Sequence, residues 1–175
     1  YTELLRFCLS NIQGWTATME LNAIRIASFF GHTAMVEMLL SPDKALTLLS
    51  DEKDRQKAAI LGAGEALRYR DLESLVKKYG PPTESIIDKG LDIEKRFEGG
   101  DYEESNHMKK YECFLQLMSE SLIVAVLNGY ARELFDFDVD NKTSLKTLRF
   151  LSDSLIYTHD EIIFAMQLIL NYGEF

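Results

Sequence analysis

The chain has few of the residues that define disulfide-rich, metal-binding or nucleic-acid-binding proteins. Its 175 residues include only two cysteines, Cys8 and Cys113, and three histidines. That is too few for a disulfide scaffold or a multi-metal protein, and no His-x-x-x-His or Cys-x-x-Cys spacing predicts a zinc site. Acidic residues outnumber basic ones by 28 to 19, for a net charge of −9. Nucleic acid and anionic membranes both require a basic surface, so neither is an expected partner.

Long apolar runs and strand signals are also missing. No run approaches the roughly 20 residues of a membrane-spanning helix, so membrane insertion is not expected. Alternating apolar and polar residues flanked by Asn-Gly or Asp-Gly turns do not occur in any sustained form. Helical spacing is common instead; Leu4, Cys8 and Ile12, for example, share one face. The sequence therefore predicts an all-α chain of short helices.

Start and stop signals predict how these helices are paired. Thr18 is a candidate cap for a helix over 19–30, and Thr158 with Glu161 forms a capping box before the apolar run 162–170. Gly31, the segment around Arg70, and Gly129 are each expected to separate one helix from the next after very few residues. Connections this short produce antiparallel helix pairs.

One segment, 81–107, departs from this pattern. It begins with Pro81-Pro82, continues as a predicted helix over 84–97, and ends in the acidic, glycine-containing stretch 98–106, which we expect to be a mobile loop. The apolar pattern resumes on both sides of it. We therefore expect a single domain over 1–175 with an inserted segment at about 81–107.

Residues 22–40 resemble an ankyrin repeat. The family pattern is Thr-Pro-Leu-His-x-Ala, two variable residues, Gly-His, an apolar pair and Leu-Leu. The positions that match are Ile24, Ile26 and Ala27 in the first helix, Gly31-His32 in the turn, and Met35, Val36, Leu39 and Leu40 in the second helix. Asn22, Ala23 and Arg25 stand where the family has Thr, Pro and His.

Weaker copies follow at irregular spacing. The second copy is predicted with Arg70 in the place of Gly31, and the third with its turn at Gly129-Tyr130. Residues 138–145 resemble a hairpin that leads into a new first helix, with 162–170 as its second helix. The spacings of 39 and 59 residues differ from the family period of about 33. The resemblance implies a degenerate ankyrin-like solenoid with a helical insertion; an unrelated α-helical bundle and a HEAT-like array are the alternatives.

The ends of the chain lack polar caps. Tyr1, Leu4 and Leu5 at one end and Tyr172 and Phe175 at the other are apolar, and the first residue is not Met. Because terminal repeats need a polar outer face, we expect a fragment of a longer protein. Divergent, insertion-bearing ankyrin arrays occur among effectors of intracellular bacteria. The resemblance thus implies a cytoplasmic protein, in the host cytoplasm if the protein is a secreted bacterial effector.

The resemblance also implies a set of partner-binding residues. In ankyrin repeats the two positions after the buried pair Ala27-Ser28 face the concave groove and vary with the partner. These positions are Phe29 and Phe30 in the first copy, and Arg68, Tyr69, Leu127 and Asn128 in the next two. Exposed aromatics beside an arginine are typical of binding hot spots. The alternative is that Phe29 or Phe30 packs under the helix 84–97 or against the helix-like run 44–49.

Three motifs suggest catalytic or ligand-binding chemistry but favour ordinary interpretations. Gly62-Ala63-Gly64 resembles a dinucleotide loop, yet it follows a helix-forming run, which favours helix packing through small residues. Asp136–Asp140 begins like a calcium loop but lacks its glycine and its bidentate glutamate. Cys113 lies in an amphipathic stretch where a packed cysteine is common. No cofactor or metal is expected.

These observations predict a non-catalytic protein–protein interaction module that uses the concave face of its inner helices. The first alternative is a substrate-positioning or regulatory domain of a larger enzyme whose catalytic part lies outside this chain. The second is an enzyme that uses Cys113 or a histidine.

Overall fold

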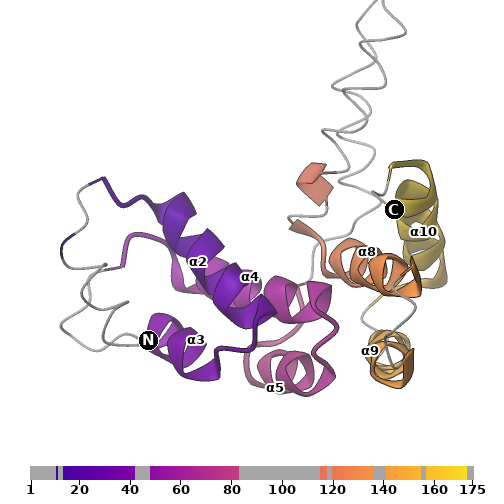
Figure 1. Ribbon diagram of the computed structural model, residues 1–175, viewed down its shortest axis with the longest axis horizontal. Coiled ribbons are helices and arrows are strands. Elements are labelled where there is room, and N and C mark those ends of the chain that lie inside the picture. The colour runs from indigo at the N-terminus through magenta and orange to yellow at the C-terminus, as the bar shows by residue number, and fades with distance from the viewer. Residues whose placement is uncertain are drawn as a thin grey trace, which may run out of the picture.

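A computed structural model describes residues 11, 14–41, 48–82, 115–117, 120–135, 141–154 and 157–172. Figure 1 shows the helices that these ranges contain. They are α2 (Ala17–Phe29), α3 (Thr33–Leu40), α4 (Glu52–Glu65), α5 (Tyr69–Tyr79), α8 (Leu122–Phe135), α9 (Asn141–Asp153) and α10 (His159–Tyr172). The described ranges contain no strand, which confirms the predicted all-α class.

Helix α2 begins two residues earlier than predicted. Thr16, not Thr18, is its N-cap, and the Thr16 hydroxyl accepts a hydrogen bond from the Met19 N–H at 3.2 Å. Thr18 is exposed in the first turn. A hydroxyl in either position fits the sequence signal, but only Thr16 has the extended backbone that a cap requires.

The predicted break at Gly31 is confirmed, and its geometry recurs 36 residues later. Gly31 has φ +71°, and the next N–H, that of His32, donates to Ala27 O at 2.8 Å. After α4 the same turn forms with Leu67 at φ +52°, and the Arg68 N–H donates to Ala63 O at 2.9 Å. These two turns fold α3 back beside α2 and α5 back beside α4.

The predicted register of the second copy is therefore wrong by three residues. Leu67, and not Arg70, stands in the place of Gly31, and Ala63 is the buried counterpart of Ala27. Leu67 adopts a backbone conformation that normally favours glycine. Its side chain is buried, and this burial offsets the conformational cost. The sequence carried no glycine to mark this turn.

A row of helices, α2, α4, α8 and α10, crosses the structure, each contacting the next. Along the long axis of Figure 1, α2 and α10 lie toward opposite ends of this row. Small residues let the helices approach closely. A Cβ atom on Gly62 of α4 would overlap the carbonyl oxygen of Arg25 on α2, and one on Gly129 of α8 would overlap that of Glu65 on α4.

Gly129 is thus a packing residue inside α8. The prediction that it separates one helix from the next is wrong. Gly62-Ala63-Gly64, by contrast, is confirmed as a helix-packing segment, because all three residues are buried in the middle of α4.

Helices α9 and α10 exchange their predicted roles. The sequence pattern predicted that 138–145 lead into a first helix and that 162–170 form its second helix. Instead α9 contacts α5 and α8, beside the second helices, while α10 contacts α8 in the inner row. The capping box at the start of α10 is confirmed: the Glu161 N–H donates to the Thr158 hydroxyl at 3.2 Å, and the Thr158 N–H donates to the Glu161 carboxyl at 2.8 Å.

The core consists of two clusters of buried apolar residues. One lies between α2, α3 and α4 and includes Ile24, Leu39 and Ala59. The larger one lies between α4, α5, α8, α9 and α10 and includes Leu122 and Val126. Leu75 and Tyr79 of α5 pack against both clusters, so the two are joined through α5.

A buried carboxyl group fixes the loop that precedes α4. Glu20 on α2 is fully buried, and its oxygens accept hydrogen bonds from the Leu49 N–H at 2.9 Å, from the Ser50 N–H at 3.2 Å and from the Ser50 hydroxyl. The buried guanidinium of Arg55 donates to Ser50 O. Leu48 and Leu49 are not helical, so the predicted helix-like run 44–49 does not extend over them.

Tyr157 contacts the start of α8, and its ionisation makes the stability of the fold depend on pH in the alkaline range. Burial raises the pKa of its hydroxyl above the ordinary value of 10.0, although the backbone N–H groups of Ile123 and Leu122 at this helix start favour the ionised form. Protonated Tyr157 is therefore favoured in the folded state, and its contribution is present below pH 10 and lost as the pH rises above it.

We expect the free energy of unfolding to fall above pH 10 by up to about 1.4 kcal/mol per pH unit from this group. Urea unfolding of the wild type and of Tyr157→Phe at a series of pH values measures the difference, which isolates Tyr157 from the other tyrosines. Parallel pH profiles for the two proteins would contradict the assignment.

Several predicted features fall outside the described residues. These are Cys8, Cys113, His107, residues 44–47 of the predicted run, the part of the insertion from 83 to 107 and the calcium-like segment 136–140.

Candidate functional site

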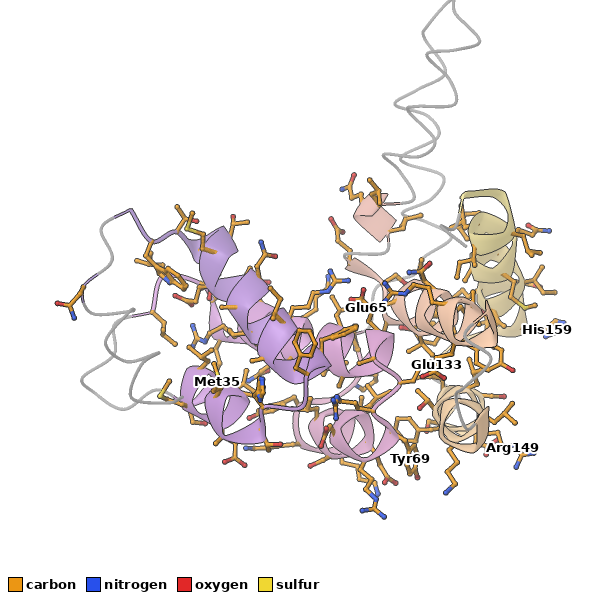
Figure 2. The ribbon with its side chains drawn as sticks, viewed as in Figure 1. Met35, Glu65, Tyr69, Glu133, Arg149 and His159 are labelled. Atoms are coloured by element: carbon orange, nitrogen blue, oxygen red, sulfur yellow. The ribbon has the colours of Figure 1, made fainter. Side chains whose placement is uncertain are left out.

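A shallow hollow lies where α2 and α4 end, beside the second half of α8. Its volume is about 300 Å³. The residues that line it are Phe29, Phe30, Glu65, Ala66, Arg68, Gly129, Arg132 and Glu133. Figure 2 shows Glu65 between the α2–α4 side of the structure and α8. The hollow combines an aromatic edge with charged groups of both signs, a composition typical of protein-binding surfaces.

Phe30 forms the aromatic edge and is 59% exposed. Its ring lies 5.2 Å from that of half-buried Phe29 in an edge-to-face arrangement, and 6.3 Å from the imidazole of His32. Phe29 thus holds the Phe30 ring from one side, while much of its surface remains open to solvent. An exposed aromatic held in one position loses little conformational entropy on binding.

Arg68 is fixed across the end of α2. Its Nε donates to Phe29 O at 2.6 Å, which satisfies a carbonyl at the helix terminus. The guanidinium lies directly over Gly31, where any side chain would overlap it. The absence of a Cβ at position 31 therefore serves both the turn and the placement of Arg68.

Three helices of the inner row meet at Glu65. Arg25 of α2 donates to one Glu65 oxygen from Nη2 at 2.8 Å and from Nε at 3.1 Å, and Arg132 of α8 reaches the other oxygen from Nη2 at 3.5 Å. The side chains of Arg25 and Glu65 are 20% and 15% exposed, whereas that of Arg132 is 47% exposed. Arg132 is thus the more weakly held and more accessible of the two arginines.

The structure brings together only half of the predicted partner-binding residues. Phe29, Phe30 and Arg68 line the same hollow. Tyr69 lies on α5 and packs edge-to-face on Phe150 of α9, with ring centroids 6.0 Å apart. Leu127 is half-buried against the core, and Asn128 is buried.

The difference follows from the register. With a recurrence of 36 residues, Glu65 and Ala66 correspond to Phe29 and Phe30, and both line the hollow. Arg68 lies there as the counterpart of His32. Sequence reasoning missed Glu65 and Arg132. The signal that could have found Glu65 is Ala63, which aligns with the buried Ala27 once Leu67 is accepted in the glycine position.

The described ranges contain no group of three or more His, Cys, Asp or Glu side chains that could hold a metal ion. Among the described helices, none is long and apolar enough to cross a membrane. Comparison of the chain with protein-family models, curated proteins and solved structures gave no match.

Proposed function

We propose that the chain is a non-catalytic interaction module of the ankyrin type, which binds a partner protein through the inner-helix face around the Phe30 hollow. The observation that carries the proposal is the 59% exposure of Phe30 beside two accessible arginines, Arg68 and Arg132. Burial of an exposed aromatic side chain contributes about 2 kcal/mol, and such residues are frequent anchors of interfaces.

The recurrence of one turn geometry supports the repeat-type arrangement. The turns at Gly31 and Leu67 share their hydrogen bonds, and each is followed by an outer helix with buried apolar residues at equivalent places, Val36 and Leu72. Stacking such pairs completes a core that one pair cannot form alone. It also leaves the ends of the inner helices side by side, where Arg25, Glu65 and Arg132 meet.

The arginines suggest the chemistry of the partner. Arg68 and Arg132 line the hollow together with Glu65 and Glu133, so the hollow has no net charge in a chain of net charge −9. We expect a partner segment that carries an apolar side chain next to a carboxylate, because the Phe30 ring and the accessible Arg132 can receive both.

Affinity capture from cell lysate, followed by calorimetry with the captured protein, tests the proposal. Phe30→Ala is expected to raise the dissociation constant at least 30-fold, about 2 kcal/mol, because it removes the exposed anchor and leaves the backbone unchanged. Arg132→Gln is expected to raise it more modestly and to reduce the salt dependence.

The matched control is Leu145→Ala, which shortens an exposed apolar side chain on α9, away from the hollow. A dissociation constant that Phe30→Ala leaves unchanged would contradict the assignment of the site. So would an increase that is equally large for Phe30→Ala and Leu145→Ala.

A further inference from the structure

The carboxylate of Glu65 is shared between two arginines that hold it unequally. Arg25 donates from two nitrogens to one carboxylate oxygen, at 2.8 and 3.1 Å, whereas Arg132 reaches the other oxygen from one nitrogen at 3.5 Å. The Arg132 contact is long for a hydrogen bond to a carboxylate. The Arg25–Glu65 pair is therefore the stronger one, and Arg132 can leave Glu65 while Arg25 keeps the carboxylate paired.

The two arginines approach Glu65 from different sides. Arg132 lines the Phe30 hollow, and about half of its side chain is exposed. Arg25 is not among the residues that line this hollow; it lines a second hollow between α2 and α4, and its side chain is largely buried. A partner in the Phe30 hollow can therefore contact Arg132 directly, whereas Arg25 acts on Arg132 through Glu65.

Glu65 stands at a place where a helix disfavours a carboxylate. It is the last residue of α4, and the partial negative charge of a helix C-terminus repels a negative side chain. The Glu65 side chain is also largely buried, so water screens its charge only weakly. Both conditions favour a cation close to Glu65. Loss of Arg25 should therefore draw Arg132 toward Glu65, and loss of the Glu65 charge should release Arg132.

We propose that Glu65 occupies the place of a partner carboxylate: it holds Arg132 in the free protein and gives it up when a carboxylate of the partner enters the Phe30 hollow. Arg25 is the positioning residue of this exchange, because it keeps Glu65 paired after Arg132 has left. The exchange replaces a long contact by a direct ion pair with the partner. It rests on the proposed function and identifies the residues that control recognition there.

Glu133, the other carboxylate of the hollow, provides a matched control. It follows Arg132 directly on α8, and adjacent residues of a helix project about 100° apart, so their side chains do not face each other. Glu133→Gln thus makes the same change of charge in the same hollow as Glu65→Gln, but it leaves the carboxylate that Arg132 contacts in place.

The rate at which phenylglyoxal modifies Arg132 tests the proposal without a partner. The reagent attacks a guanidinium that is not held in an ion pair, and mass spectrometry of peptides resolves Arg132 from the other arginines. Glu65→Gln is expected to raise the rate about threefold and Arg25→Gln to lower it about threefold, the size of effect typical of a weak ion pair. A variant that merely loosened the fold would raise the rate in both cases.

Circular dichroism verifies that each variant retains its helices, and each of the two variants tests the exchange if the other does not fold. An unchanged rate in Glu65→Gln, a higher rate in Arg25→Gln, or an equal rise in Glu133→Gln and Glu65→Gln would overturn the proposal. The last result would mean that the overall charge of the hollow, and not the contact with Glu65, controls Arg132.

Calorimetry with the protein captured by the wild type tests the exchange itself. Glu65→Gln should lower the dissociation constant about threefold and Arg25→Gln should raise it about threefold, and both effects should disappear in an Arg132→Gln background. If Phe30→Ala weakens binding but these opposite shifts are absent, the exchange is wrong and the hollow remains the site. If Phe30→Ala has no effect, the proposed function fails and the exchange fails with it.

Discussion

Replacement of Glu20 by alanine is expected to lower the free energy of unfolding by about 3 kcal/mol. The carboxyl group is fully buried and accepts three hydrogen bonds, two from backbone N–H groups and one from the Ser50 hydroxyl. Alanine leaves these donors without their acceptor and opens a cavity beside the core, and each change is costly. Urea unfolding monitored by circular dichroism measures the loss.

Two further variants separate the hydrogen bonds from the packing. Glu20→Gln preserves the volume but turns one acceptor into a donor that faces the Leu49 or Ser50 N–H, so we expect a loss of about 2 kcal/mol. Glu37→Gln, at an exposed position of α3, is the control and should change stability by less than about 0.5 kcal/mol. A Glu20→Gln variant as stable as this control would show that the hydrogen bonds contribute nothing.

Replacement of Gly62 by alanine is expected to cost about 2 kcal/mol even though alanine favours helix. The new Cβ would overlap the backbone carbonyl of Arg25, and a backbone cannot move aside unless α2 and α4 separate. The gain in helix propensity, about 1 kcal/mol, offsets only part of this cost. Chemical denaturation gives the net effect.

Gly64→Ala is the matched control in the same helix. Its Cβ would meet the ends of the Leu122 and Val126 side chains, which can shift further than a backbone carbonyl can, so its loss of stability should be clearly smaller than that of Gly62→Ala. Equal losses for Gly62→Ala and Gly64→Ala would mean that contact with backbone is not what makes Gly62 necessary.

Local signals in the sequence predicted local structure well. The Gly31 turn, the Thr158–Glu161 capping box and the helical class depend on neighbouring residues, and the sequence is sufficient for these. The signal failed where tertiary contacts decide. Leu67 adopts a positive φ because its side chain is buried, and Gly129 stays helical because α4 packs against it. Neither cause is visible in adjacent residues.

The candidate site was predicted in part for the same reason. Phe29 and Phe30 follow directly from the well-matched segment 22–40. Tyr69 was carried over through a register that the second turn shifts by three residues. Leu127 and Asn128 were placed by a predicted turn at Gly129, which lies inside α8. The Glu65 cluster depends on three helices that are far apart in the chain, with 40 residues between Arg25 and Glu65 and 67 between Glu65 and Arg132. No spacing rule for a single helix detects such a cluster.

The unlike turns at Gly31 and Leu67 limit how this array can have grown. A duplicated unit that carried leucine into position 31 would place a side chain in the space that the Arg68 guanidinium occupies. The two turns are therefore not interchangeable, because a leucine at position 31 would displace the exposed Arg68 side chain from its hydrogen bond to Phe29 O.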